Sequence, residues 1–253
     1  MISGLMIIKD GLSLGYPFVE AITQVIPYVD EFVVVDFGSS DGTIDILKSL
    51  ILKYPKIKVM FADWPTEFRG GRAIGVAQDQ ARVYCKGDYI LLVQADEIWD
   101  PQALKHTIEL TKLYPLVAMF NIPFYHLFAN FQLPVKWYGE AVRVYKNIPQ
   151  ITSVGDGWTM TGHYPQMSAR CTPILHCGSL GWRSSYQKIV HHAGLYTNHP
   201  EYQVLALEYQ ARLDHNDPEP NHLLKTSPYL SRVPKILHDL LGIERYYVRP
   251  KLI

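Results

Sequence analysis

The sequence of 253 residues is poor in cysteine, has no excess of charge of either sign and contains no long hydrophobic run. Its three cysteines, Cys85, Cys171 and Cys177, form no CxxC pair, and such an odd, sparse set predicts reduced thiols without a disulfide framework. Lysine and arginine together number 24, and so do aspartate and glutamate. Proteins that bind nucleic acids usually carry a basic excess, so this balance argues against that class of function.

No apolar run approaches the length of about 18 residues that a membrane-spanning helix needs. No secretory signal is predicted, because the first residues have no basic region and Lys9 and Asp10 interrupt the first apolar run. The expected location is the cytoplasm. Residues 231–241 leave peripheral membrane association open, because their apolar side chains share one helical face. Packing of that face against the protein is favoured, since the segment is short and His238 and Asp239 dilute its basic character.

What the sequence does contain is a regular alternation of strand-like apolar runs and segments with helical periodicity. In the first hundred residues, strands are predicted at 2–8, 31–35, 57–61 and 89–93. A segment with apolar residues three and four positions apart follows each of the first three runs. Alternation of this kind predicts an α/β fold with a mainly parallel sheet and helices on both faces.

After the fourth strand the pattern loosens. A helix is predicted over residues 102–113, with Asp100 as its N-cap and Pro101 in its first turn. Residues 140–145 alternate as a strand of a small antiparallel element would. The chain turns helical again from residue 186, which predicts a helical C-terminal appendage.

The apolar run before Gln94 leads directly into the adjacent carboxylates of Asp96 and Glu97. A short, continuous apolar run is typical of a strand buried on both faces, and open α/β sheets bind ligands at the carboxyl ends of such strands. The two acids would suit a hard divalent cation that also binds phosphate oxygens. The alternative interpretation is a solvated turn before the helix that Asp100 caps.

Asp36 also ends a predicted buried strand, and a turn of small residues follows it. Its carboxylate could accept a hydrogen bond from a nucleobase or a ribose hydroxyl. In the alternative, Asp36, Ser39 and Asp41 form an Asx-turn and cap the next helix. Arg69 and Arg72 flank two glycines at a predicted helix start, where they either bind a diphosphate or are ordinary solvated arginines.

Two later residues are candidates for chemistry. His176 follows an apolar pair and could complete the coordination shell of a metal that Asp96 binds, or it could be a hydrogen-bonded structural histidine. Asp156 lies in a glycine turn beside Trp158. It could serve as a general base whose pKa is raised by desolvation against the indole, or it could simply form the turn.

Four stretches resemble, in order and spacing, the motifs of family 2 glycosyltransferases. They are VVVDFGSSDGT at 33–43, GGRAIGVAQDQA at 70–81, GDYILLVQADEIWDP at 87–101 and ILHCGSLGWR at 174–183. The resemblance implies a GT-A fold, a nucleotide-sugar donor (UDP- or GDP-sugar) and a divalent metal, Mn²⁺ or Mg²⁺. It spans residues 1–185, with a nucleotide-sugar-binding half over 1–100 and an acceptor half over 101–185, followed by the appendage over 186–253.

The resemblance also implies roles for single residues. Asp36 matches the first aspartate of the family's V-V-D-D-G-S-x-D-G-T turn, which helps to hold the base, whereas Phe37 replaces the second. Asp96 matches the second, metal-binding acid of the D-x-D motif. Gln94 replaces the first acid and would hydrogen-bond a ribose. His176 matches the late histidine that often joins the metal.

Asp156 lies roughly where the family's catalytic base falls, after the central antiparallel strand. Trp158, beside Asp156, and Arg183, at the end of the last of the four stretches, complete the predicted substrate-binding set. The prediction is an inverting transferase acting on a glycan, lipid-linked or protein acceptor. The alternative is a non-catalytic sugar- or nucleotide-binding module, suggested by the departures at Gln94 and Phe37.

Overall fold

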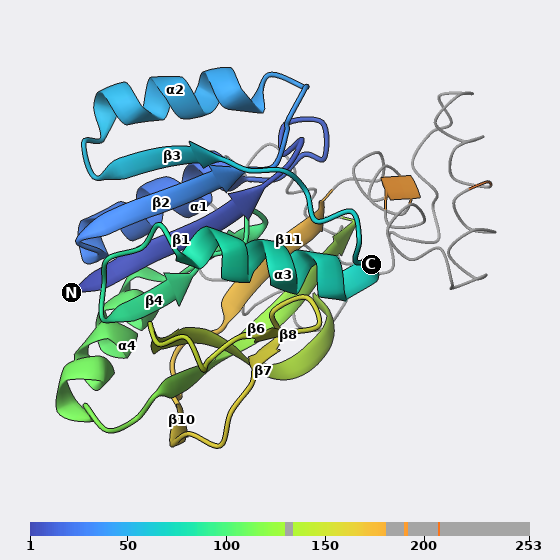
Figure 1. The fold of residues 1–253 in the computed structure, drawn as a ribbon. Coiled ribbons are helices and arrows are strands. Elements are labelled where there is room, and N and C mark those ends of the chain that lie inside the picture. The colour runs from blue at the N-terminus through green and yellow to red at the C-terminus, as the bar shows by residue number, and fades with distance from the viewer. Residues whose placement is uncertain (130–133, 181–189, 192–206, 208–253) are drawn as a thin grey trace, which may run out of the picture.

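The computed structural model describes residues 1–129, 134–180, 190–191 and 207. Residues 231–241 and Arg183 lie outside the described residues, and so does nearly all of the predicted C-terminal appendage. In the described part, helices pack on both faces of one large mixed sheet (Figure 1).

Strands and helices alternate through the first hundred residues, as the periodicity predicts. These elements are β1 (Ile2–Ile8), α1 (Phe18–Val25), the 3-10 turn η1 (Ile26–Tyr28), β2 (Glu31–Asp36), α2 (Thr43–Lys53), β3 (Ile57–Phe61), α3 (Gly70–Arg82) and β4 (Tyr89–Leu92). The rest of the described chain forms β5 (Glu97–Ile98), α4 (Pro101–Leu113), β6 (Met119–Ala129), β7 (Pro134–Lys146), β8 (Ser153–Val154), β9 (Thr159–Met160), β10 (Gln166–Ser168) and β11 (Ile174–Leu180). Strands therefore dominate the second half.

Helix α4 begins where the sequence predicts. Asp100 Oδ1 accepts hydrogen bonds from the amides of Gln102 (2.8 Å) and Ala103 (3.0 Å). Pro101 occupies the first helical position, where the lack of an N–H costs nothing. The helix does not extend before this cap. Residues 94–99 are therefore free to form a turn and the short strand β5, which carry the acidic pair of Asp96 and Glu97.

The large sheet has the strand order β3-β2-β1-β4-β7-β6-β11-β5, and β10 pairs with β6 off this path. Strands β3, β2, β1 and β4 are parallel, which confirms the predicted α/β fold class. Strand β7 is antiparallel to both β4 and β6, in agreement with the alternation over 140–145. Strand β11 is parallel to β6 and antiparallel to β5, a pairing that sets His176 opposite Glu97.

The two faces of the sheet have separate hydrophobic cores because successive strand residues point to opposite sides. Met6 and Val34 contribute to the core that α1, α2 and α4 cover. Leu5 and Val33 contribute to the other core, where Ala77 of α3 packs against them. Figure 1 shows α3 lying across the front of the sheet, so this helix separates that face from solvent.

The small antiparallel sheet of β8 and β9 lies close to α3. A Cβ on Gly75 would be 2.4 Å from the carbonyl oxygen of Gly155, and a Cβ on Gly71 would be 3.0 Å from the amide nitrogen of Asp156. Any side chain at Gly75 would therefore push the β8–β9 turn away from the helix. The glycines of α3 are thus required for the close approach of this turn.

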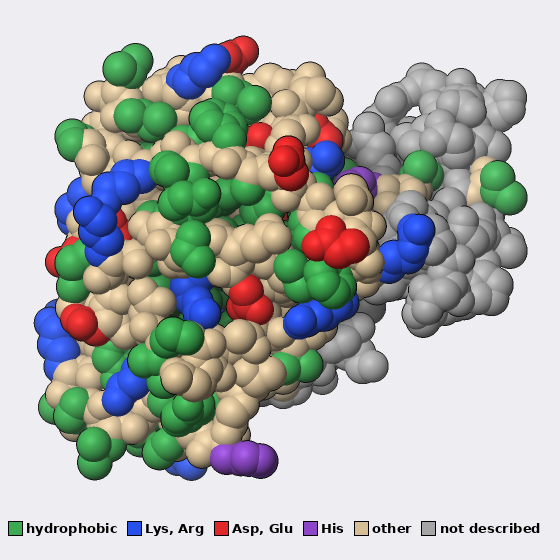
Figure 2. Space-filling view, viewed as in Figure 1, with side chains coloured by type: hydrophobic (Ala, Val, Ile, Leu, Met, Phe, Trp, Pro, Cys, Tyr) green, Lys and Arg blue, Asp and Glu red, His purple; other side chains and the backbone are tan. Residues whose placement is uncertain are grey.

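Among the described helices, none is long and apolar enough to cross a membrane. Figure 2 shows acidic and basic side chains interspersed on the face that α3 covers. Among the residues that the structure describes, this face therefore has no extended region of one charge, in agreement with the balanced composition of the chain.

Candidate functional site

The candidate site lies at the carboxyl-terminal edge of the parallel strands. Strand β2 ends at Asp36, and the chain that leaves β4 passes through Gln94 and Asp96. Strand β11 brings His176 to this region by pairing with β5. Open α/β sheets bind ligands at this edge, in the crevice outside the carboxyl ends of the strands.

Asp36 is fully buried, and its two carboxylate oxygens have different surroundings. Oδ1 accepts hydrogen bonds from the amides of Gly38 (3.0 Å) and Ser39 (2.9 Å), which forms the Asx-turn of one interpretation. Oδ2 is buried and has no hydrogen-bond partner within the described structure. A buried oxygen without a donor is costly, so a ligand that presents an N–H or O–H group here would relieve that cost.

Phe37 forms an apolar surface beside this carboxylate. It is 1% exposed, and its ring meets that of Trp64 edge-on, with centroids 5.7 Å apart and an interplanar angle of 87°. Such an edge-to-face pair stabilises the loop beyond the area that it buries. The residue that departs from the family turn is therefore part of the core.

Ser39 and Asp41 hold the loop after β2 to the loop after β1. Ser39 Oγ accepts a hydrogen bond from the amide of Asp10 (2.8 Å), and Asp41 Oδ2 accepts one from the amide of Ser13 (2.6 Å). Asp41 Oδ1 also accepts from the amide (3.0 Å) and the hydroxyl (2.6 Å) of Thr43, where α2 starts. Both side chains maintain the shape of the loops around Asp36, and their predicted contacts with substrate stay predictions.

These contacts predict a pH dependence for folding. Burial raises the pKa of Asp41, but hydrogen bonds from Thr43 and Ser13 outweigh burial and lower that pKa below its ordinary value of 3.8. The stabilisation is therefore present at neutral pH and is lost as the pH falls through the folded-state pKa. Asp41→Asn should flatten the acid limb of the free energy of unfolding against pH, measured in urea between about pH 5 and about pH 2. Asp45, which is exposed on α2, provides the control variant Asp45→Asn. Equal slopes of the free energy of unfolding against pH in wild type and Asp41→Asn would contradict the prediction.

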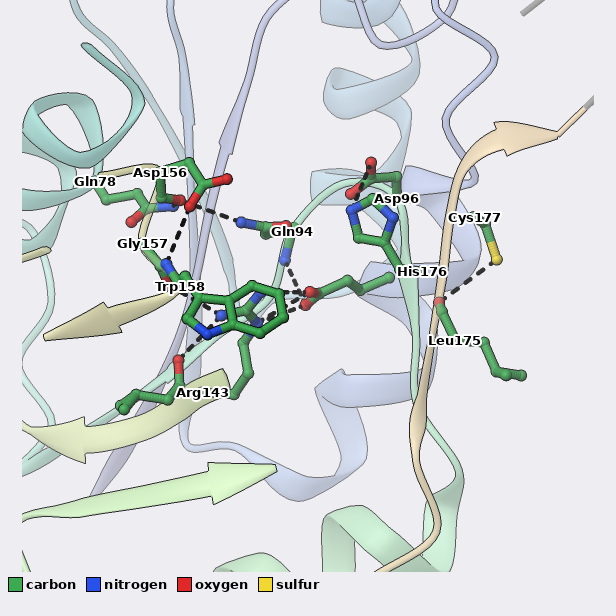
Figure 3. Close-up of polar contacts among 12 residues, drawn as sticks. Gln78, Gln94, Asp96, Arg143, Asp156, Gly157, Trp158, Leu175, His176 and Cys177 are labelled. Carbon is green, nitrogen blue, oxygen red and sulfur yellow. Dashed lines mark hydrogen bonds and ion pairs between the residues drawn. The ribbon is translucent and has the colours of Figure 1, made fainter. Parts of the chain in front are cut away.

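The two predicted metal ligands lie beside each other. Asp96 Oδ2 is 3.3 Å from His176 Nε2, and Figure 3 shows the two side chains pointing toward one another. Asp96 is 6% exposed, and its carbonyl oxygen accepts a hydrogen bond from the amide of Cys177 at 2.6 Å. This backbone contact attaches the loop after β4 to β11, so the pairing of the two side chains follows from the sheet.

Asp96 and His176 fit a cation that also binds a diphosphate. The described residues contain no group of three or more His, Cys, Asp and Glu side chains that could hold a metal ion. Mg²⁺ at phosphates, however, typically uses one or two protein carboxylates and takes its other ligands from phosphate oxygens and water. Imidazole is an additional donor that suits first-row metals. Two protein donors are therefore enough for the predicted type of site.

Glu97 does not join Asp96 as a second acidic ligand, which corrects the expectation drawn from the adjacent carboxylates. Glu97 is fully buried and accepts hydrogen bonds from Nη2 (2.7 Å) and Nε (3.0 Å) of Arg143. Burial raises the pKa of Glu97, and the charge of Arg143 opposes that rise. Asp96 lies in the turn before β5 and contacts His176, whereas Glu97 begins β5 and pairs with Arg143, so the two carboxylates have different partners.

Asp156 lies at the exposed tip of the turn between β8 and β9. Gly155 (φ +59°) and Gly157 (φ +84°) flank it in the left-handed region that favours glycine. The ring of Trp158 packs against Phe124 with centroids 4.4 Å apart, and Asp156 stays exposed. The expectation that Trp158 desolvates Asp156 is therefore wrong.

The turn of Asp156 adjoins the loop that carries the metal ligands. The carbonyl oxygen of Asp156 accepts hydrogen bonds from Nε2 of Gln94 (3.4 Å) and Nε2 of Gln78 (3.1 Å). Gln94 precedes Asp96 by two residues, so the structure brings the predicted base, ribose ligand and metal site into one region. Figure 3 shows this arrangement. Sequence reasoning missed Gln78, although it lies in the second motif.

The predicted arginines have different positions. Arg69 is the N-cap of α3 and is exposed. Arg72 is exposed as well, donates a hydrogen bond from Nη1 to the carbonyl oxygen of Ser153 (3.2 Å), and lies 5.6 Å from the ring centroid of Phe68. Their contacts with a diphosphate stay predictions, and Arg183 lies outside the described residues.

Comparison with known proteins identifies one family: the model described as glycosyl transferase family 2 matches residues 17–176. Similar solved structures include residues 1–349 of TarS from S. aureus in complex with UDP-GlcNAc (15% identity, 95% of this chain and 78% of that chain, TM-score 0.45). Another is the mannosyltransferase PcManGT from Pyrobaculum calidifontis in complex with GDP-Man and Mn²⁺ (14%, 100% and 76%, TM-score 0.49). These structural likenesses carry no information on substrate or metal. No curated protein matches the chain.

Proposed function

The chain belongs to family 2 of the glycosyltransferases, and we propose that it transfers a sugar from a nucleoside-diphosphate sugar to an acceptor hydroxyl with inversion at the anomeric carbon. The contact of Asp96 with His176 at the ligand-binding edge of the sheet is the observation that carries this proposal. It supports a divalent cation, Mn²⁺ or Mg²⁺, at the diphosphate of the donor.

The nucleoside would bind beside Asp36. The unpartnered Oδ2 offers an acceptor for an N–H group of the base or a hydroxyl of the ribose. Ser39 and Asp41 connect the loop after β2 to the loop after β1, and these hydrogen bonds fix the backbone around Asp36. The acceptor oxygen is therefore in place before the ligand binds. Gln94, which is half-buried in the chain that leaves β4, would bind the ribose.

The proposed chemistry needs a base and a stabilised leaving group. Asp156 would accept the proton of the acceptor hydroxyl as the acceptor oxygen forms its bond to the anomeric carbon. The bond from that carbon to the diphosphate oxygen breaks at the same time, and its electron pair leaves with the nucleoside diphosphate. A metal held by Asp96 and His176 would supply charge neutralisation for this leaving group. The exposed position of Asp156 leaves it accessible to an acceptor hydroxyl.

The metal site can be tested by calorimetry. Asp96→Asn should weaken the Mn²⁺-dependent binding of UDP or GDP by about tenfold or more, since even residues that only support a metal ligand contribute that much. Binding without the ion should change little. Asp45→Asn, on α2 and 79% exposed, is the matched control. Unchanged Mn²⁺-linked affinity in Asp96→Asn would refute the assignment of the metal ligand.

The alternative, a non-catalytic binding module, is motivated by Gln94 and Phe37, the two departures from the family motifs. A panel of UDP- and GDP-sugars with Mn²⁺ and with glycan, lipid-linked and peptide acceptors distinguishes the two functions. Turnover of any donor, including its slow hydrolysis, supports the transferase. Tight binding without hydrolysis or transfer across the panel supports the module.

A further inference from the structure

We propose that Gln78 is a positioning residue that holds the turn of Asp156 in the geometry required for proton transfer. The inference rests on the proposed function, because it takes Asp156 as the base. Gln78 lies on α3 and is fully buried. A side chain without exposed surface acts through the residues that it contacts, and its hydrogen-bonded neighbours belong to the turn.

The amide of Gln78 contacts both the start of β8 and the tip of the β8–β9 turn. Nε2 donates a hydrogen bond to the carbonyl oxygen of Asp156 (3.1 Å), and Oε1 accepts one from Oγ of Ser153 (3.0 Å). Both groups of the side-chain amide are therefore used within the β8–β9 hairpin. Figure 3 shows Gln78 and Gln94 on either side of Asp156, so two amides approach the same carbonyl oxygen.

Within the turn, the amide of Gly157 donates to the carbonyl oxygen of Val154 (3.0 Å) and the amide of Trp158 donates to Asp156 Oδ1 (3.2 Å). Contacts from outside the turn add to these two. Gly155 and Gly157 flank the exposed Asp156, and glycine has more backbone freedom to lose than any other residue. A base on an unrestrained glycine turn would sample many orientations. Hydrogen bonds from a buried partner reduce that freedom, and here the partner is on a helix that is itself packed on the sheet.

The contact between turn and helix is closely packed. A Cβ on Gly157 would be 2.0 Å from Oε1 of Gln78, and one on Gly75 would be 2.4 Å from the carbonyl oxygen of Gly155. Asp79, the next residue of α3, accepts the amide of Ser153 at 3.0 and 3.2 Å. Glycine on both surfaces thus permits the approach that lets Gln78 reach the turn.

This geometry makes Gln78 relevant to the rate rather than to donor binding. A displacement of about 1 Å of a reacting group can cost roughly a hundredfold in rate. The carbonyl oxygen of Asp156 accepts the two hydrogen bonds described above, from Gln78 and from Gln94. Removal of the Gln78 amide would leave the longer of the two, from Gln94. Asp36 and Asp96 make none of these contacts, and Gln94 keeps its own contact with the carbonyl oxygen of Asp156 in such a variant, so donor affinity should be kept.

The test uses the full chain with Gln78→Met, which keeps the length of the side chain and removes both hydrogen bonds. Hydrogen exchange should show faster exchange of the amides of residues 155–158, with kcat lowered roughly ten- to a hundredfold. The Kd for UDP or GDP with Mn²⁺ should stay as in wild type, which also reports that the variant is folded. Gln80→Met, the same substitution at an exposed position of α3, is the matched control and should change neither quantity.

The double variant Gln78→Met/Asp156→Asn separates positioning from a general structural effect. If Gln78 acts through Asp156, the double variant should be no slower than Asp156→Asn alone. Multiplication of the two rate effects, or unchanged exchange and kcat in Gln78→Met, would overturn the inference. Full turnover in Asp156→Asn would instead show that Asp156 is not the base of the proposed function. The catalytic role of Gln78 would then be lost as well, even if Gln78→Met speeds hydrogen exchange in the turn.

Discussion

Asp156→Asn should lower kcat by about a hundredfold or more, the scale expected when a general base is lost. The amide is nearly isosteric with the carboxylate and cannot accept the proton of the acceptor hydroxyl at neutral pH. The hydrogen bonds from Gln78 and Gln94 use the backbone carbonyl oxygen of Asp156, which the substitution leaves unchanged. The amide of Trp158 donates to Asp156 Oδ1 (3.2 Å), and the side-chain oxygen of asparagine can accept the same hydrogen bond. The Kd of the donor nucleotide should therefore stay close to the wild-type value, measured by calorimetry beside steady-state kinetics.

Glu140→Gln is the control for this prediction. Glu140, the acidic residue that begins the alternating segment 140–145, is the rival for the role of base. It is exposed on β7, and its Oε1 accepts a hydrogen bond from Oγ of Ser168. It should keep most of the turnover if Asp156 is the base. The reverse result, with near-normal kcat in Asp156→Asn and a large loss in Glu140→Gln, would move the assignment to Glu140.

Arg143→Met should lower the free energy of unfolding by roughly 3–5 kcal/mol, because it leaves the charge of Glu97 buried without its cationic partner. The two side chains are 2% and 0% exposed, and their nearest nitrogen and oxygen are 2.7 Å apart. Arg143 also donates to the carbonyl oxygen of Gly157 at 3.0 Å, so the same substitution loosens the residue after Asp156. Urea denaturation followed by circular dichroism measures the loss of stability.

The matched control is Lys48→Met, which breaks the exposed pair of Lys48 with Asp45 and should cost about 0–1 kcal/mol. The double variant Arg143→Met/Glu97→Leu should recover much of the lost stability, since neither charge then remains buried. Equal stabilities for Arg143→Met and Lys48→Met would show that the buried pair contributes far less than its geometry indicates. A double variant less stable than Arg143→Met would show that the two residues contribute independently.

The sequence by itself determined the elements whose signals are local. Apolar periodicity identified the parallel strands and the helices between them, because a strand repeats every two residues and a helix every 3.6. Asp100 and Pro101 marked the start of α4 because capping involves only neighbouring residues. The positions of Asp36 and Asp96 at strand ends followed from the same patterns, and parallel strands place such ends at one edge of the sheet.

The tertiary structure alone decided which of these residues meet. The pairing of β5 with β11 brings Asp96 and His176 to 3.3 Å, and motif order implied this contact only through the resemblance to a family. Glu97 does not join Asp96 because it pairs with Arg143. The sequence marks Arg143 only as one charged residue within an apolar strand. Contacts between distant segments depend on strand register and on which faces become buried, and those are properties of the whole packed chain. For the same reason, the two hydrogen bonds of Gln78 have no counterpart in the local pattern of α3, where its position is indistinguishable from that of any polar helix residue.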